Sequence, residues 1–390
     1  MRSRQAHRLV TILIVTSGIC VGSGASGETL GAAFIGPPES VFDTKTQSCE
    51  PTNIPDQRAV AFRDANNQVH LFASHSVVRA MVGPNLNQLT RRCNVVYRSP
   101  IDPDPADFDQ YDWPGGFFTA DGRNVAALVH SEFHGDDVPG MCSAPKDRLF
   151  DCLWGAVTYA VSHDGGNSFT VPRPPGNLVA SLPYQFAPNP QRGPAGYHSP
   201  TAIVQLGAFQ YALINIWKYR DQAYGACLIR TSNPFDPQSW RAWDGSGFNV
   251  QFIDPYVVAN AIPAEHVCKP VLNVPEVDSL AYLPSAKLFV ATQLTHDKRF
   301  GPLGVYLNTS PDLIHWTRPV ALVDLDTMVA AEGDGRWDYR YASLLDPAST
   351  DRDFVDLTDR PYLYYVRLDR MHPPLVRTLL RRQIRLTITN

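Results

Sequence analysis

The chain is short of charge, has no basic run and lacks several common catalytic motifs. Charged residues make up 18% of its 390 residues, and the formal net charge is -4. A mildly acidic chain of this kind argues against nucleic acid or an anionic membrane surface as a partner. No P-loop, nucleophile elbow or HExxH pattern is present, which excludes the sequence signatures of those nucleotide-binding, esterase and metalloprotease sites.

No CxxC spacing occurs among the cysteines, so a zinc site is a poor interpretation of them. Beyond Cys20, which lies in the N-terminal segment, six cysteines remain. An even number in an exported protein favours disulfides, although six cysteines allow fifteen pairings. The favoured pairs are Cys142–Cys152 as a local loop staple, then Cys49–Cys93 and Cys227–Cys268 by order along the chain.

The first 25 residues have the pattern of a signal peptide. A basic start is followed by an apolar run, Leu9 to Val15, that is too short to span a bilayer. Small residues at Ser23 to Ala25 suit cleavage, so the mature chain is expected to start near Ser26. We expect residues 26–390 to form a single domain, secreted or periplasmic, without a membrane anchor once the signal is removed.

With 33 prolines and 26 glycines, the chain is rich in turns, and one turn recurs. Ser162–Phe169 and Ser310–Trp316 both place an Asp two positions after a Ser and close on an aromatic, and Thr231–Trp240 is a looser copy. An Asp or Asn side chain in such a turn bonds backbone N–H groups, which is typical of a hairpin. Asp164 and Asp312 are therefore expected to be structural and not catalytic.

Each copy follows an alternating apolar run and precedes another short strand-like run. Five units of three or four short strands account for nearly the whole mature chain. A hairpin repeated at a near-constant interval predicts an all-β fold, a five-bladed β-propeller. The units are about Asp56–Arg92, Asp112–Phe169, His198–Trp240, Glu276–Trp316 and Arg340–Leu386.

The Ser-x-Asp-x-Gly-x-x-aromatic turn at Ser162–Phe169 resembles the Asp-box, or bacterial neuraminidase repeat, of sialidase-like propellers. Ser310–Trp316 lacks the glycine and is more similar to the turn of five-bladed glycosidases. The resemblance to sialidases implies an alternative to the five-bladed fold, which is a six-bladed propeller with an arginine triad and a Tyr nucleophile. The chain lacks their Phe/Tyr-Arg-Ile-Pro opening, and only Arg58 and Arg340 are assignable to a triad.

The five-bladed group resembles arabinanases, xylosidases and invertases, which place acidic residues at the axial ends of the innermost strands. A propeller gathers the first residues of those strands around a central funnel, where ligands usually bind. Polar residues at the unit starts are therefore the candidates, joined by Glu132, which follows the second strand of unit two. Glu276 and Trp217 belong to the wider set. The favoured catalytic residues are Asp56, Glu132, Asp278 and His198; the favoured substrate-binding residues are Arg58, Asp112, Trp113, Arg340 and Tyr341.

Glycoside hydrolysis needs one carboxyl as acid and another as base or nucleophile. Asp56 is the favoured base, and Glu132 or Asp278 the favoured acid. Asp112 would tune a pKa, the arginines would clamp hydroxyls or a carboxylate, and the aromatics would stack on a sugar. His198 is either a general acid or a satisfied loop residue.

Each candidate has a structural alternative. An Asp before a strand is commonly a turn cap. His130, Glu132 and His134 alternate along one strand, which also fits a metal site. No cofactor is expected; Ca²⁺ in the axial channel is an alternative that no EF-hand-like spacing supports. A basic C-terminal group is expected to be a solvated strand edge: Arg377, Arg381, Arg382 and Arg385.

The sequence thus predicts a monomeric, exported glycoside hydrolase acting on an oligo- or polysaccharide. A non-catalytic glycan-binding propeller would keep the aromatics and lose the carboxyl pair. A polysaccharide lyase would use a His or Tyr base with an Arg to neutralise a uronate, for which His198, Tyr341 and Arg340 are the candidates. The hydrolase assignment rests on fold-level analogy together with the axial carboxyls.

Overall fold

Most of the regular structure consists of short antiparallel strands. The computed structural model describes residues 29–187, 193–295, 297, 299, 301–324, 336–371 and 376–389, so the predicted signal peptide lies outside the described residues. Helix in this part of the chain is limited to α1 (Thr44–Gln47) and the 3-10 turns η1 (Gly135–Asp137), η2 (Lys146–Cys152), η3 (Pro237–Ser239) and η4 (Pro263–Glu265). None of these described helices has the length and apolarity that a bilayer crossing would need.

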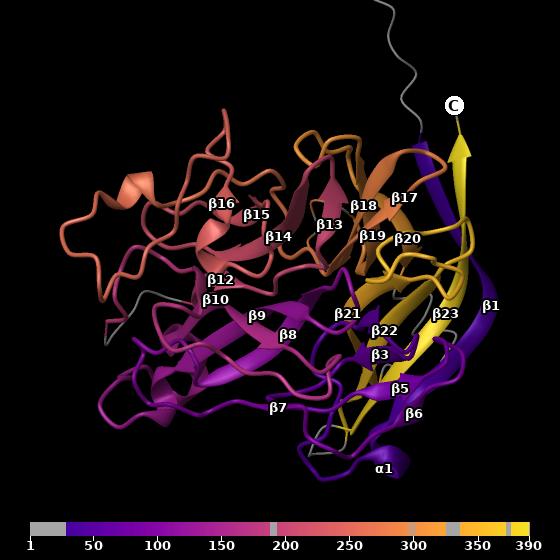
Figure 1. Cartoon of the computed structure of the whole chain (residues 1–390), viewed down its shortest axis with the longest axis horizontal. Helices are drawn as coiled ribbons and strands as arrows, with labels where there is room; N and C mark the ends of the chain where they lie inside the picture. The colour runs from indigo at the N-terminus through magenta and orange to yellow at the C-terminus, as the bar shows by residue number, and fades with distance from the viewer. Residues whose placement is uncertain are drawn as a thin grey trace, which may run out of the picture.

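The strands form the blades of a propeller (Figure 1). Blade one contains β2 (Val60–Arg63), β3 (Val69–Phe72), β5 (Met81–Gly83) and β6 (Thr90–Arg91), and beside it β4 (Val77–Val78) pairs with β7 (Tyr97–Arg98). Blade two contains β8 (Tyr111–Phe118), β9 (Val125–His134), β10 (Leu153–Ser162) and β11 (Leu178–Ala180). Blade three contains β12 (Ala195–His198), β13 (Val204–Leu206), β14 (Phe209–Trp217), β15 (Gly225–Thr231) and β16 (Arg241–Ala242).

Blade four contains β17 (Ser279–Leu283), β18 (Leu288–Thr295), β19 (Gly304–Ser310) and β20 (Val320–Asp324). Blade five contains β21 (Trp337–Leu345), β22 (Tyr362–Asp369), β23 (Val376–Thr389) and β1 (Thr29–Asp43). Blades two and three are joined by a short parallel pairing of β10 with β12. The described strands therefore make five blades, as predicted, and not the six of the alternative.

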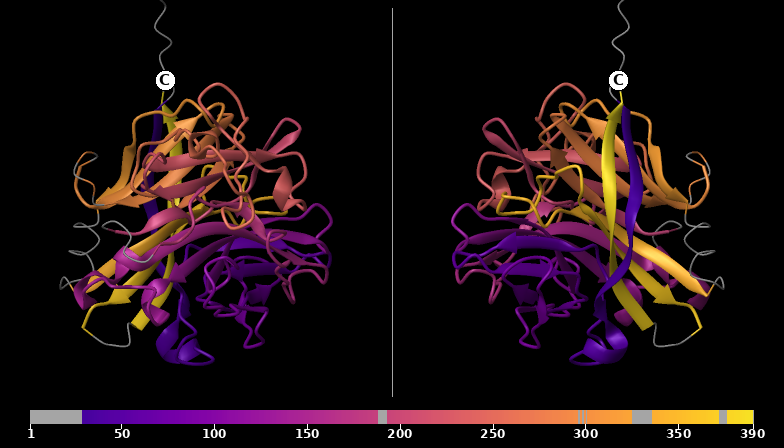
Figure 2. Two further views of the ribbon diagram at one scale, coloured as in Figure 1. Left: turned by 90° about the vertical axis from the view of Figure 1, so that its left-hand side faces the viewer. Right: turned by 90° about the vertical axis from the view of Figure 1, so that its right-hand side faces the viewer.

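The ring is closed by a strand that the sequence did not predict. β1 pairs antiparallel with β23, from Thr29 opposite Thr389 to Asp43 opposite Thr378, and supplies the outer strand of the last blade. Figure 2 shows the indigo and yellow strands side by side along the molecule. Prolines at 37 and 38 obscure the strand pattern, but an edge strand tolerates proline, and the pairing register shifts between Phe34 and Pro38.

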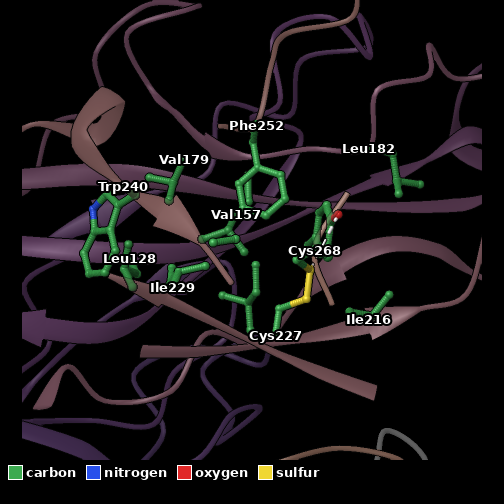
Figure 3. Packing of buried hydrophobic residues seen from close by; sticks show 14 of the residues in the cluster. Leu128, Val157, Val179, Leu182, Ile216, Cys227, Ile229, Trp240, Phe252 and Cys268 are labelled. Atoms are coloured by element: carbon green, nitrogen blue, oxygen red, sulfur yellow. Dashed lines mark hydrogen bonds between the residues drawn. A yellow bond between two sulfur atoms is a disulfide. The ribbon is translucent and has the colours of Figure 1, made fainter. Parts of the chain in front are cut away.

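The core lies between neighbouring blades, where the apolar faces of the strands meet. The largest such cluster joins blades two and three and includes Val157, Ile229, Trp240 and Phe252 (Figure 3). All three disulfides match the favoured pairs. Cys227–Cys268 lies inside this cluster, Cys49–Cys93 ties the chain before blade one to its outer edge, and Cys142–Cys152 closes a loop of blade two.

The recurring Asp turns join the third strand of a blade to its outer edge. Asp164 Oδ1 accepts hydrogen bonds from Ser162 Oγ at 2.8 Å and Ser168 N at 2.9 Å, and Asp312 Oδ1 accepts from His315 N at 2.8 Å. Each carboxylate bonds the backbone of its own loop. The structural interpretation of these aspartates is therefore confirmed.

Closure by β1 makes a testable contribution to stability. Phe42 on β1 is 2% exposed and packs in a core cluster with residues of blades one and five. Phe42→Ala is expected to lower the free energy of unfolding by about 3–5 kcal/mol, because it leaves a cavity at the closing seam. Ile35→Ala, at an exposed position of the same strand, should change it by less than about 0.5 kcal/mol. Chemical denaturation measures the change in the free energy of unfolding for each variant. Equal changes would contradict a stabilising role for the packing of Phe42 where β1 closes the ring.

Burial alone would raise the pKa of Asp312, but hydrogen bonds from His315 and Ile314 lower it to about 2. Because this pKa lies below the unfolded value of about 3.9, the ionised carboxylate stabilises the fold above about pH 4 and loses this effect as the pH falls toward 2. Asp312→Ala should cost about 1 kcal/mol at pH 7 and less at pH 3, since the position is part-exposed. The exposed Asp359→Ala is the matched control, and a pH-independent loss would refute this account.

Candidate functional site

A pocket of about 350 Å³ opens at the axial end of the innermost strands. All four predicted catalytic residues line it, although they come from four different blades. Three of the five predicted binding residues line it as well: Arg58, Trp113 and Tyr341. The axial funnel expected from the propeller thus brings together residues up to 285 positions apart, such as Asp56 and Tyr341.

Irregular backbone lies at this pocket in two of the blades. Tyr341 has φ 61° and lies in a register shift between Arg340 and Ser343 on β21, and Ser199, just after β12, has φ 43°. Such conformations are uncommon for residues with a Cβ, cost about 1–3 kcal/mol each and concentrate at functional sites. On β8, a Cβ added to Gly115 would lie 2.9 Å from Arg58 Nη2, so a larger residue there would displace that guanidinium.

Arg58 closes the pocket toward the axial channel. Its side chain is buried, its Nη2 donates to Gly115 O at 3.1 Å, and it also lines a cavity of about 20 Å³ deeper along the axis. Burial lowers the pKa of Arg58 to about 10, while the carboxylates of Asp278 and Glu276 act in the opposite direction. The guanidinium remains charged at neutral pH and supplies a fixed positive charge at the pocket floor.

Asp56 is held by partners that favour its anion. Its Oδ1 accepts from Tyr341 Oη at 3.1 Å and is ion-paired with Arg377, and its Oδ2 lies 3.4 Å from His75 Nε2. Hydrogen bonds and opposite charge stabilise an ionised carboxylate. The prediction that Arg377 belongs to a solvated edge is wrong: its side chain is 12% exposed. Arg381 is buried too and pairs with Glu39.

Glu132 lies between two histidines of its own strand, β9. His130 Nε2 lies 3.3 Å from Oε1, and His134 Nε2 is hydrogen-bonded to Oε2 at 2.8 Å. Burial alone would raise the pKa of Glu132, but these two histidines, with His75, outweigh it and lower the pKa. The lowered pKa keeps Glu132 ionised at neutral pH, which disfavours it as a proton donor.

Glu276 and Asp278 occupy the opposite kind of environment. Burial raises the pKa of both, and for Asp278 the neighbouring Glu276 raises it further, to well above its usual value. Asp278 is 6% exposed and accepts from Leu294 N at 2.6 Å. Glu276 is part-exposed toward the pocket. Glu276 and Asp278 therefore favour their protonated forms at a pH at which the Glu132 carboxyl is already ionised.

His198 is a neutral side chain at the pocket wall. Its ring stacks on Trp217 with centroids 4.0 Å apart, and burial, followed by the charges of His130 and Arg58, lowers its pKa well below the usual range. Its Nδ1 lies 3.2 Å from Ser199 Oγ, and its buried Nε2 has no hydrogen-bond partner among the described residues. A neutral imidazole suits hydrogen bonding to a ligand hydroxyl better than proton donation.

The remaining two predicted residues do not join this group. Asp112 is 1% exposed, accepts from Tyr97 Oη and does not line the pocket; burial raises its pKa to about 7. Arg340 turns its guanidinium to Asp338, with Nη2 2.9 Å from Oδ2. Arg340 does not line the pocket, but its positive charge is close enough to act against burial, which raises the pKa of Glu276 and of Asp278.

Several pocket residues were not among the favoured set. Glu276 stands two positions before Asp278, and a period of two places both on one face of an extended chain, so alternation was the available signal. Trp217 belonged to the wider set, and it ends the second strand of unit three. Gln57 and Phe150 carried no comparable sequence signal.

The described residues include one group of three acidic side chains close enough to share a metal ion. It consists of Asp102, Asp107 and Asp109, on the segment before β8, and none of them lines the pocket. Burial, then the charges of Asp102 and Asp107, raises the pKa of Asp109 to about 6. The His130, Glu132 and His134 set is instead organised around histidine–carboxylate contacts.

No protein-family model and no curated protein matches the chain. Among solved structures, the catalytic domain of a GH62 alpha-L-arabinofuranosidase from Coprinopsis cinerea is 12% identical, with a TM-score of 0.45 over 90% of this chain and 96% of that one. An alpha-L-arabinanase from Cellvibrio cellulosa is 11% identical, with a TM-score of 0.44 over 87% and 91%. An endo-arabinase from Bacteroides thetaiotaomicron is 10% identical, with a TM-score of 0.45 over 87% and 97%.

The raised pKa of Asp278 predicts an effect on stability. Since the folded state holds this proton more tightly than the unfolded state, Asp278 destabilises the fold increasingly as the pH rises above about 4. Asp278→Asn keeps an oxygen to accept from Leu294 N and should raise the free energy of unfolding at pH 7 by about 1 kcal/mol. The gain should shrink below pH 4. Denaturant titrations at both values measure it.

The matched control is Asp346→Asn. Asp346 is buried away from the pocket, and its Oδ2 accepts from both Thr358 N and Thr358 Oγ1 at 2.6 Å. Its Oδ1 also accepts, from Ala348 N at 2.8 Å, so Asn can replace only one of the two accepting oxygens. The loss of charge-assisted bonds should lower stability at pH 7 by about 1–3 kcal/mol. A loss of stability in both variants at pH 7 would contradict the assignment of a retained proton to Asp278.

Proposed function

We propose that the protein is an exported glycoside hydrolase. The observation that carries this proposal is the meeting, in one axial pocket, of carboxyls held in opposite environments: Asp56 and Glu132 as anions, Glu276 and Asp278 toward their protonated forms. Pairs of carboxyls whose surroundings push their protonation apart provide the acid and the base that glycosidic cleavage requires.

In this proposal Glu276 is the general acid. It is more exposed than Asp278, which is close enough to feel the charge of Glu276 and accepts from Leu294 N. Glu276 would donate its proton to the glycosidic oxygen as the bond from that oxygen to the sugar's anomeric carbon breaks. Glu132 would remain an anion between its histidines and stabilise positive charge that develops on the sugar ring.

Asp56 is the proposed base. Its carboxylate would take a proton from a water molecule as the oxygen of that water bonds to the anomeric carbon, so that one water is consumed for each bond broken. Tyr341 and Arg377 fix its orientation. Trp113 and the stacked pair of His198 and Trp217 offer apolar ring faces and a free imidazole nitrogen for sugar binding.

A sialidase-like reaction fits these residues less well. A Tyr nucleophile needs a lowered pKa, whereas burial, with the charges of Glu276 and Glu132, raises the pKa of Tyr341. Among the described residues that line the pocket, Arg58 is the single arginine, where a sialidase would use three. Export is part of the proposal, supported by three disulfides and by the basic and apolar pattern of residues 1–25.

The test is cleavage of a broad oligosaccharide panel by residues 26–390, followed by mass spectrometry. Glu276→Gln and Asp56→Asn should each lower kcat/KM by about 10²–10⁴-fold, because each removes one proton-transfer group. Glu265→Gln, at an exposed position of η4, is the matched control. Activity should fall as the pH rises through the raised pKa of Glu276, and this basic limb should disappear in Glu276→Gln on an activated leaving group.

The products separate this proposal from its rivals. Products that gain one water support hydrolysis. Unsaturated products, with absorbance from a new double bond, would replace it with a lyase. Saturable binding of one glycan without any product would replace it with a non-catalytic glycan-binding propeller. Wild-type rates in both the Glu276 and Asp56 variants would remove these two residues from the reaction.

A further inference from the structure

One aromatic side chain at the pocket is exposed to solvent to an unusual degree. Phe150 is 71% exposed, among the highest values of the large apolar residues described, and it also lines the axial pocket. Trp113, by contrast, is 9% exposed at the same pocket. Single exposed apolar residues are common on protein surfaces, so the exposure of Phe150 is informative because its ring also lines the pocket.

The loop that carries Phe150 is braced on both sides of it. Cys152, two residues later, is completely buried and bonded to Cys142. Asp151 pairs with Arg148 across Phe150, and its Oδ1 accepts from Gly193 N at 2.7 Å. The carbonyl of Phe150 accepts from Leu153 N. The ring is therefore presented from a fixed backbone, which reduces the entropy lost when a ligand stacks on it.

Polarity changes along the pocket from floor to rim. The buried guanidinium of Arg58 and the carboxyl of Asp278 are charged or polar groups at the closed end, whereas Phe150 is the exposed apolar group. Hydroxyl groups of the sugar to be cleaved match the closed end. Since Arg58 closes the pocket there, the rest of the substrate must leave through the open side that Phe150 lines.

We infer that Phe150 binds the leaving group of the substrate, an inference that rests on the proposed hydrolase function. The ligand it would take is the apolar C–H face of a second sugar, or an aryl group, attached to the sugar on the floor. A pocket closed at one end in this way selects a chain end, so the hydrolase would release one terminal sugar at a time.

The test compares substrates of the same sugar whose leaving groups do or do not offer a surface on which Phe150 can stack. With an oligosaccharide or an aryl glycoside of the preferred sugar, Phe150→Ala should lower kcat/KM by about tenfold, mainly through KM, because the stacking surface is lost. With the glycosyl fluoride of the same sugar, whose leaving group has no surface to stack, kcat/KM should stay unchanged. Phe150→Tyr should restore activity on the larger substrates. Leu149→Ala, on the same loop but outside the pocket lining, is the matched control.

The outcomes distinguish this inference from the function on which it rests. If the wild-type chain cleaves glycosides but Phe150→Ala loses nothing, or loses equally on the fluoride, the leaving-group site is refuted and the hydrolase stands. Products of mixed length from an end-labelled oligosaccharide would refute the chain-end selection. If the wild-type chain cleaves no glycoside, the proposed function fails and the inference fails with it. Thermal unfolding of Phe150→Ala should match wild type, since the ring is exposed.

Discussion

The pairing of β1 with β23 is the constraint on which the rest of the structure depends. Each blade packs mainly on its two neighbours, so the blades define a common axis only when the ring is closed. The closing strand extends from Thr29 to Asp43, and Asp56 follows it by a short connection. β23 carries Arg377, the ion-pair partner of Asp56. The seam that closes the fold therefore also positions one carboxylate of the pocket.

Charge balance within the pocket follows from this arrangement. Four carboxyls and one buried guanidinium share a small volume, and they could not all ionise there without unpaired buried charge. Arg377 compensates Asp56, and His134 is hydrogen-bonded to Glu132. For Glu276 and Asp278, burial outweighs the nearby charges of Arg58 and Arg340 and raises the pKa, which favours the protonated forms. The strained φ values of Ser199 and Tyr341 are part of the cost of this convergence. Backbone strain that lowers stability in this way is typical of sites that serve binding or catalysis.

Much of the fold was readable from local patterns. The Asp turns at Asp164 and Asp312 bond atoms within a few residues, so their role depends on nothing distant. Alternating apolar runs between such turns give the blade count. β1 was missed because its glycines and prolines hide the alternation, and its partner β23 lies at the other end of the chain. The disulfide pairs followed sequence order because each joins segments of the same or adjoining blades.

For the site, the sequence by itself determined most of the positions that face the axis, because unit starts in a propeller converge. It selected Asp56, His198 and Asp278 in this way and added Glu132 from the end of a second strand, and all four line the pocket. The tertiary structure alone decided which of these carboxyls keeps a proton, why Asp112 turns away toward Tyr97, and that Arg377 is a buried partner of Asp56. The physical reason is that protonation and orientation depend on burial and on charges from distant strands, and local sequence carries no record of either.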